Sequence, residues 1–176
     1  MDGVLVVVYS LTGTGQRVAK LLEQTRGWRV AQIRDLHRRA GWLGNLRCML
    51  DSLMRRKPAI EYLGPDPAGF AAVVLVSPVW MLRMAGPMRS FLAHYGHSVQ
   101  DAAIVCVMGG SGAPNVAAEA GAYLNHAPLL STFFTAREVE DGSCAGRVGV
   151  FAGALEAMLR GPQTALREAQ WSPQAG

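Results

Sequence analysis

Short hydroxyl side chains and glycines follow directly after the first apolar run of the chain. Residues 4–8 read Val-Leu-Val-Val-Val, a pattern typical of a buried parallel strand. Next comes the segment Ser10-Leu11-Thr12-Gly13-Thr14-Gly15-Gln16, and a helical pattern begins at Arg17. Between a strand and a helix N-terminus, backbone N–H groups, hydroxyls and the positive end of the helix dipole converge on one point. The chemistry that this segment favours is therefore the binding of a phosphate group.

The segment differs from the two best-known phosphate-binding loops. A P-loop requires a glycine, four residues and then Gly-Lys-Ser/Thr, whereas Lys20 lies too far into the expected helix. A dinucleotide-binding fingerprint requires three spaced glycines and an acidic residue at the end of the second strand. Only Gly13 and Gly15 are available here, and Asp35 is a poor substitute for that acid. An ordinary turn capped by a threonine remains the alternative interpretation.

The pattern of hydroxyls around Gly13 resembles the phosphate loop of the flavodoxin-like, FMN-binding family. In that family the loop wraps the 5′-phosphate of FMN, and hydroxyls and N–H groups take the place of positive side chains. The resemblance implies a phosphate site made of Ser10, Thr12, Gly13 and Thr14, with the amides of Gly15 and Gln16. Many members of the family carry a third hydroxyl at the position of Gly15. Its loss weakens the expected site without abolishing it, because the backbone N–H remains.

A second stretch with this resemblance follows the third expected strand and reads Ser77-Pro78-Val79-Trp80. The third loop of the flavodoxin superfamily commonly has a Pro-x-aromatic sequence. The resemblance implies that backbone groups of Ser77, Val79 and Trp80 meet the isoalloxazine ring and the ribityl chain. The Trp80 side chain would then offer an aromatic face or edge to the cofactor. The alternative is that Trp80 simply covers the core.

The third stretch, Gly109-Gly110-Ser111-Gly112, follows the fourth expected strand. In flavodoxins a tyrosine from this loop commonly stacks on the outer face of the flavin, but here no aromatic residue occurs between Met108 and Tyr123. Small residues at Gly109 and Gly110 would let backbone amides approach the ring and leave one face open. The arrangement is similar to flavodoxin-fold reductases, which stack a nicotinamide or a quinone on the flavin. A glycine-rich turn without a special role is the alternative.

Strand and helix patterns alternate along the chain, which predicts an α/β fold with a parallel sheet. The expected strands cover about residues 3–9, 28–36, 70–76, 102–108 and 129–139, and the expected helices cover about residues 15–26, 84–94, 113–124 and 144–159. Five strands with intervening helices predict a three-layer, doubly wound sheet of order 2-1-3-4-5. Its ligand crevice lies at the carboxyl ends of strands one and three. We expect one domain over residues 1–161 and a C-terminal tail over residues 162–176.

Residues 38–57 form an unusually long connection between the second and third expected strands. An apolar stripe at helical spacing is flanked there by basic residues. We expect a helix that covers the sheet. Three alternatives remain, namely that the segment extends the flavin cleft, pairs with a second subunit or rests on an anionic membrane surface.

Composition narrows the class of protein further. The chain has 176 residues, half of them hydrophobic, which suits one core. The sequence has neither an apolar run long enough for a transmembrane segment nor a signal peptide, and its three cysteines form no Cys-x-x-Cys pair. A cytoplasmic location is therefore expected. The four histidines show no metal-ligand spacing, so we expect no metal site.

Charge separates two functional classes. Flavodoxins that act as electron carriers are typically acidic, whereas this chain carries a net charge of +4 and a pI near 9.3. A basic surface around the cleft attracts anionic small molecules such as NAD(P)H, and Arg83, Arg89 and Arg137 are candidates for it. Binding of nucleic acid is a poor hypothesis, because no recognition motif accompanies this modest charge.

The leading hypothesis is an FMN-dependent oxidoreductase that passes electrons from NAD(P)H to a quinone or a similar small acceptor. No residue is identified as a general acid or base, since the cofactor carries the chemistry. The alternatives are a non-enzymatic electron-transfer flavodoxin and an interaction module that has lost FMN. Reductases of this fold often build the site across a dimer, so a homodimer is one expected assembly.

Overall fold

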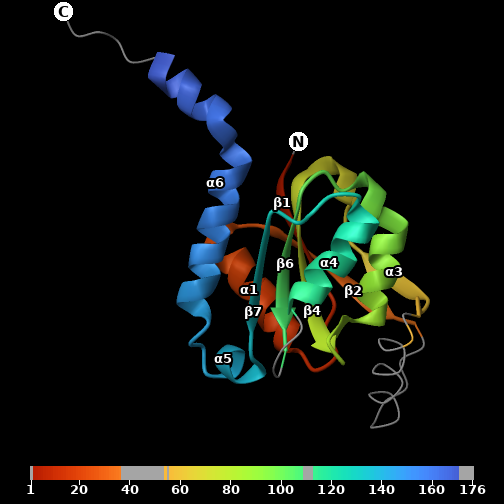
Figure 1. The fold of residues 1–176 in the computed structure, drawn as a ribbon. Coiled ribbons are helices and arrows are strands. Elements are labelled where there is room, and N and C mark those ends of the chain that lie inside the picture. Colours follow the sequence, from red (N-terminus) through yellow and green to blue (C-terminus); the bar gives the residue numbers. More distant parts are fainter. Residues whose placement is uncertain (1, 37–53, 55, 109–112, 171–176) are drawn as a thin grey trace, which may run out of the picture.

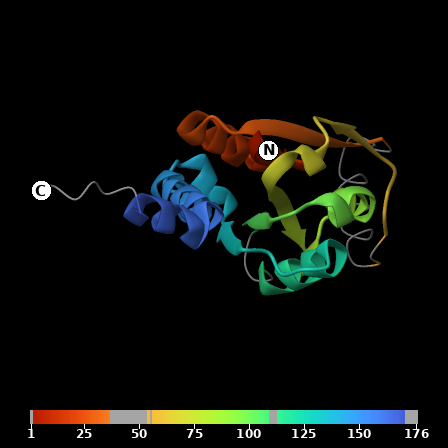
Figure 2. The same cartoon turned by 90° about the horizontal axis from the view of Figure 1, so that it is seen from above.

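A sheet between two layers of helices forms the part of the chain that the computed structural model describes, namely residues 2–36, 54, 56–108 and 113–170 (Figures 1 and 2). Its strands are β1 (Asp2–Val8), β2 (Arg29–Asp35), β3 (Ile60–Leu63), β4 (Phe70–Trp80), β5 (Arg83–Met84), β6 (Ala102–Val107) and β7 (Leu130–Phe134). They lie in the order β3-β2-β1-β4-β6-β7, and β5 pairs with β4 outside this path. The pairs β1–β2, β1–β4, β4–β6 and β6–β7 are parallel.

Both faces of the sheet are buried under helices. The helices are α1 (Thr14–Arg26), α3 (Gly86–Tyr95), α4 (Ala113–Leu124), α5 (Ala136–Glu140) and α6 (Ala145–Gln170), with 3-10 turns at η1 (Pro67–Gly69) and η2 (Gly96–Ser98). On β1, Leu5 and Val7 face the core that α3 and α4 cover, whereas Val6 and Val8 face the core of α1, α5 and α6. Because a strand covered on both faces needs apolar residues at every position, the uninterrupted Val/Leu run is explained.

The predicted α/β architecture with a mostly parallel central sheet is confirmed, but the sheet is larger than predicted. The described residues form seven strands, not five. The additional strands are both antiparallel, with β3 beside β2 at the edge and β5 beside β4. Their shortness explains why the sequence pattern did not indicate them, since β3 has four residues and β5 has two.

Several predicted boundaries need correction. The fifth strand was expected over residues 129–139, but β7 ends at Phe134 and α5 follows. A capping box causes this change: Thr135 Oγ1 accepts a hydrogen bond from Glu138 N (3.2 Å), and Thr135 N donates to Glu138 Oε2 (2.7 Å). The third strand extends beyond Val76 to Trp80, and the next helix begins two residues later than expected, at Gly86.

Two further predictions concern the C-terminal residues 162–176 and the long connection of residues 38–57. Helix α6 continues to Gln170, although Gly161 has non-helical backbone angles (φ 57°, ψ 172°), and the helix bends there in Figure 1. The division into a domain and a tail at residue 161 stays a prediction. The predicted helix of residues 38–57 lies outside the described residues, apart from positions 54, 56 and 57. None of the helices in the described part combines the length and the apolar character that crossing a membrane requires.

The buried side chain of Arg89 connects α3 to three other parts of the chain. Its Nε donates to Glu119 Oε1 on α4 (2.6 Å), and its Nη2 donates to the carbonyl oxygen of Met84 on β5 (3.0 Å). Its Nη1 donates to the carbonyl oxygen of Arg56 (3.0 Å). Arg89 is 0% exposed, so its charge is shielded from solvent and depends on partners within the protein, these three among them. Arg89 is therefore a structural residue and does not face the cleft as considered from the sequence.

The hairpin between β4 and β5 turns through two residues with unfavourable backbone angles. Trp80 pairs with Arg83, so Met81 and Leu82 alone form the turn. Their φ angles are +49° and +61°. Two-residue turns with positive φ at both positions normally carry Asn or Gly, because other side chains crowd the backbone there. Both side chains are about half exposed (53% and 49%).

We predict that Glu119→Gln lowers the free energy of unfolding by about 3 kcal/mol, because it removes the carboxylate charge that lies 2.6 Å from the buried Arg89 guanidinium. Urea denaturation of both proteins measures the difference. Glu156→Gln is the control, since the Arg26–Glu156 pair is partly exposed (30% and 24%) and its loss is expected to cost less than about 1 kcal/mol. Equal losses in the two variants would contradict the special role of Arg89.

We also predict that the double substitution Met81→Asn, Leu82→Gly raises the free energy of unfolding by about 1–2 kcal/mol, because it relieves the strain of the turn. Thermal and urea unfolding measure the gain. The control is Met158→Asn on α6, an equally exposed site (49%) with helical geometry, where no gain is expected. An unchanged or lower stability of the hairpin variant would show that the turn is not strained.

Candidate functional site

The loop between β1 and α1 places a helix N-terminus at the carboxyl end of the sheet. Gly13 is the N-cap residue of α1 with φ +94°, a conformation that favours glycine, and it has no side chain to cap the helix. The helix begins at Thr14 and has 13 residues, so its positive end faces this loop.

The Ser10 side chain forms hydrogen bonds with the backbone of its own loop. Its Oγ accepts hydrogen bonds from Gly13 N (3.1 Å) and Gly15 N (3.0 Å). A hydroxyl oxygen has two lone pairs and one hydrogen, so both lone pairs of Ser10 are used and its O–H remains a donor. The Gly15 amide, which was expected to bind a phosphate directly, therefore donates to the Ser10 hydroxyl in this structure, as does the Gly13 amide.

The same serine explains why residue 15 is a glycine. A Cβ at Gly15 would lie 3.0 Å from Ser10 Cβ, 3.2 Å from Ser10 Oγ and 3.3 Å from the carbonyl oxygen of Tyr9. Such contacts are tighter than ordinary van der Waals packing, and the last is to backbone. The hydroxyl that is missing at residue 15 could not be added without moving Ser10.

Further donors surround this serine. Among the described residues, no partner is observed for the backbone N–H groups of Thr14 and Gln16, which belong to the first turn of α1. The hydroxyls of Thr12 and Thr14 lie 3.2 Å apart, so one donates to the other and the pair keeps a donor for a ligand. The loop thus presents hydroxyls and amides, without a basic side chain, to one small region.

A cavity of about 240 Å³ lies between this loop and the ends of β4 and β6. Its lining residues come from three segments that follow or end the central strands, namely Ser10, Leu11, Thr12, Thr14, Gly15, Pro78, Trp80 and Val107. The structure therefore brings together six of the residues that the sequence indicated. It adds Leu11 and Val107, which are apolar and gave no chemical signal.

Trp80 forms one wall of the cavity and is held by an aromatic contact. The rings of Tyr9 and Trp80 meet edge to face, with centroids 6.1 Å apart and planes at 89°. Tyr9 is buried and Trp80 is partly buried, so the tryptophan is anchored at one edge while it borders the cavity.

Other predicted site residues lie elsewhere. Ser77 and Val79 belong to strand β4 and are buried, with Val79 in the core beneath α3 and α4. Neither of them is among the described residues that line the cavity, and Val79 belongs to the same core cluster against which Trp80 packs. The Gly109 and Gly110 positions lie outside the described residues. Neither Gly13 nor Gln16 lines the cavity, although Gly13 shapes its loop.

No cysteine is among the described residues that line the cavity. Burial raises the pKa of the Cys106 thiol to about 12, so this side chain on β6 is neutral at physiological pH. Within the described residues, no group of three His, Cys, Asp or Glu side chains is arranged to hold a metal ion.

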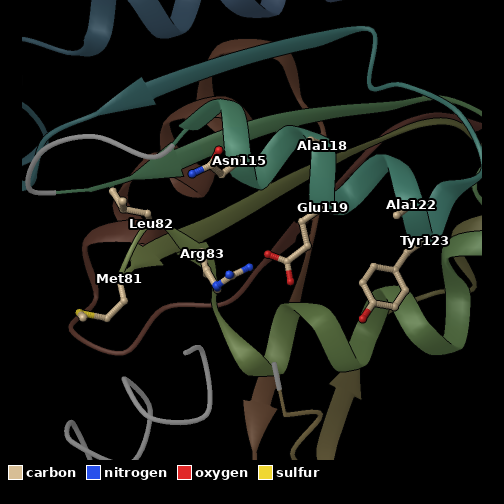
Figure 3. Close-up of a pocket in the computed structure, with 8 residues that line it drawn as sticks. All are labelled: Met81, Leu82, Arg83, Asn115, Ala118, Glu119, Ala122 and Tyr123. Carbon is tan, nitrogen blue, oxygen red and sulfur yellow. The ribbon is translucent and has the colours of Figure 1, made fainter. Parts of the chain in front are cut away.

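A second and larger cavity, of about 690 Å³, lies on the other side of the β4–β5 hairpin (Figure 3). The hairpin and α4 line it with Met81, Leu82, Arg83, Asn115, Ala118, Glu119, Ala122 and Tyr123. Among these residues the sequence had singled out only Arg83 as a candidate.

Comparison by sequence finds neither a matching family model nor a matching curated protein. Comparison by structure finds several flavoproteins. The flavoprotein of Lactobacillus acidophilus NCFM in complex with FMN has a TM-score of 0.65 and 15% identity, over 81% of this chain and 99% of that one. A putative flavoprotein of Bacteroides eggerthii has a TM-score of 0.63 and 18% identity, over 81% and 96%. RosB, solved with the intermediate 8-demethyl-8-formylriboflavin-5′-phosphate, has a TM-score of 0.57 and 10% identity, over 100% and 90%.

These identities are low, so the likeness is one of architecture and not of function. It agrees with the mostly parallel sheet, with the helices on both of its faces and with the position of the β1–α1 loop at its carboxyl end. The resemblance noted from the sequence is thereby confirmed at the level of the fold: the chain has the flavodoxin-like fold.

Proposed function

We propose that the protein binds FMN and acts as an oxidoreductase that passes electrons from NAD(P)H to a quinone or a similar small acceptor. One observation carries the proposal. A single cavity gathers the hydroxyls of Ser10, Thr12 and Thr14 at a helix N-terminus and sets them beside the aromatic side chain of Trp80. A phosphate donor set next to an aromatic wall suits a phosphorylated ring cofactor.

The residues present fit the phosphate of FMN. The Ser10 hydroxyl has a hydrogen to donate, and the amides of Thr14 and Gln16 have no partner among the described residues. Anion binding at such a helix N-terminus needs no lysine or arginine, and none is among the described residues that line this cavity. We therefore assign the phosphate to Ser10, Thr12, Thr14 and Gln16, with the amides of Gly13 and Gly15 holding the Ser10 hydroxyl in place.

The remaining lining suits the less polar part of the cofactor. Leu11, Pro78, Trp80 and Val107 offer apolar surface at the same cavity. Its volume of about 240 Å³ is below the roughly 300–1,000 Å³ that is typical of pockets for whole ligands. We infer that it takes the phosphate and the adjoining part of FMN, and that Gly109 and Gly110 approach the ring as the resemblance implies.

When FMN is bound, its flavin ring can accept a hydride and pass the electrons on as a hydride or one at a time. The protein's own contribution is to hold the phosphate, to fix Trp80 through Tyr9 and to exclude water with apolar walls. Structural neighbours that were solved with FMN or with a riboflavin-phosphate intermediate support this assignment. The net charge of +4 supports an anionic nicotinamide donor.

Binding of FMN is tested by titrating the cofactor-free protein and following the quenching of flavin fluorescence. We predict that Thr12→Glu lowers the affinity at least about 100-fold, because it opposes the phosphate with a carboxylate. Thr25→Glu is the matched control, since Thr25 is exposed at the other end of the same helix and donates only to the carbonyl oxygen of Leu21. Equal affinities of Thr12→Glu and wild type would refute the phosphate site.

Turnover is tested separately with the FMN-loaded protein. We predict oxidation of NADH or NADPH that requires FMN, accelerates when benzoquinone is added and disappears in Thr12→Glu. Absence of turnover with both nicotinamides, in a protein that binds FMN, would contradict the oxidoreductase. In that case, reduction of the flavin in separate one-electron steps would support the alternative of a non-enzymatic electron carrier.

A further inference from the structure

The larger cavity is bounded by two elements that the core holds in place. The hairpin contributes Met81, Leu82 and Arg83, and α4 contributes its face from Asn115 to Tyr123 (Figure 3). Met84 N at the base of the hairpin donates to Glu119 Oε2 on α4 (3.3 Å). The volume of the cavity, about 690 Å³, lies within the range of pockets that take whole small molecules.

In the described part of the chain, one cationic and one anionic side chain line this cavity, and the anion is already paired with a cation of the core. Figure 3 shows the Arg83 guanidinium and the Glu119 carboxylate directed into the same space. Glu119 accepts a charged hydrogen bond from Nε of the buried Arg89 (2.6 Å), and no ion pair between Glu119 and Arg83 is observed. Among the described residues no ion pair of Arg83 is observed, although this side chain is partly buried. Lys57 adds a further cation 5.2 Å from the ring centroid of Tyr123.

Apart from Asn115, which adds an amide at one end, the rest of the described lining is apolar or aromatic. Ala118 and Ala122 are one helical turn apart on α4 and expose only methyl groups. Opposite them, Met81 and Leu82 project from the hairpin with about half of their surface exposed. This geometry suits a planar apolar body with an anionic group at the end near Arg83.

The strain of the hairpin supports a role for these side chains. Met81 and Leu82 occupy positions where Asn and Gly are favoured, so folding alone does not explain their large side chains. Residues in unfavourable backbone conformations cluster at functional sites.

From these observations we propose that the cavity between the β4–β5 hairpin and α4 is a second binding site, which takes a small planar aromatic carboxylate. Arg83 pairs with the carboxylate, and the aromatic ring lies between the hairpin tip and the alanines of α4. The site is separate from the phosphate-loop cavity, because Trp80 and Met81 are adjacent in the chain but line different cavities.

The test uses 2-naphthoate as the probe and the neutral 2-naphthalenemethanol as its shape-matched control, with binding to the full chain measured by calorimetry. We expect saturable binding of 2-naphthoate, and binding of the alcohol that is about tenfold weaker. Arg83→Gln is expected to weaken 2-naphthoate about tenfold, to the level of the alcohol, because a charged hydrogen bond is lost. Arg83→Lys is expected to fall between the two, since it keeps the charge and loses the bidentate geometry.

Two further variants test whether binding depends on this cavity and not on the net charge of the protein. Ala118→Leu fills the flat wall and is expected to weaken both probes. Arg29→Gln, at an exposed position at the start of β2, changes the net charge equally and is expected to leave both affinities unchanged. Absence of saturable binding to wild type, or equal 2-naphthoate affinity of wild type and Arg83→Gln, would overturn the proposal.

The outcome is independent of the proposed flavin function. The same FMN titration is run on Arg83→Gln, and we expect the affinity for FMN to be unchanged, because Arg83 does not line the phosphate-loop cavity. Failure of 2-naphthoate binding with intact FMN binding would refute the second site alone, whereas the reverse result would refute the flavin assignment alone.

Discussion

The buried pair of Arg89 and Glu119 is the interaction on which the arrangement of both cavities depends. Glu119 holds α4 against the hairpin through Met84 N, and Arg89 holds the same hairpin against α3 through the Met84 carbonyl oxygen. A charge that is 0% exposed cannot lose its partner without a large desolvation cost. The pair therefore fixes the position of the strand end that carries Trp80 on one side and of the turn that carries Met81 and Leu82 on the other.

The parallel sheet supplies the second constraint, because it brings the carboxyl ends of its strands to one edge. The end of β1 releases the chain into the Ser10 loop, and the end of β4 carries Pro78 and Trp80 to the same place. In sheets of this kind, ligands bind where neighbouring strands send their connections to opposite faces. The connection after β1 leads to α1 on one face, and that after β4 leads to α3 on the other.

Much of this could be predicted from the sequence, because the signals are local. The Val-rich run, the hydroxyl-glycine loop and the Pro-Val-Trp stretch each indicate their own element, and six predicted residues do line one cavity. The role of Ser10 as an acceptor for two amides depends on its rotamer and on the backbone of Gly13, which no pattern records. The burial of Arg89 was equally hidden, since its partner lies 30 residues away on another helix. The Thr135–Glu138 capping box, by contrast, has a sequence signature, namely a threonine followed three residues later by a glutamate, which predicts the start of a helix at this point.

The two-residue turn after Trp80 has a consequence for how this region can vary. Side chains alternate along a strand, so inserting one residue into β4 before Trp80 would turn the Trp80 side chain to the other face, and inserting one after it would shift the pairing of Trp80 with Arg83. Surface loops usually accept insertions and deletions freely. Here the length of the hairpin is constrained, because the hairpin separates the two cavities. Related proteins with both cavities should therefore keep the number of residues between the two strands.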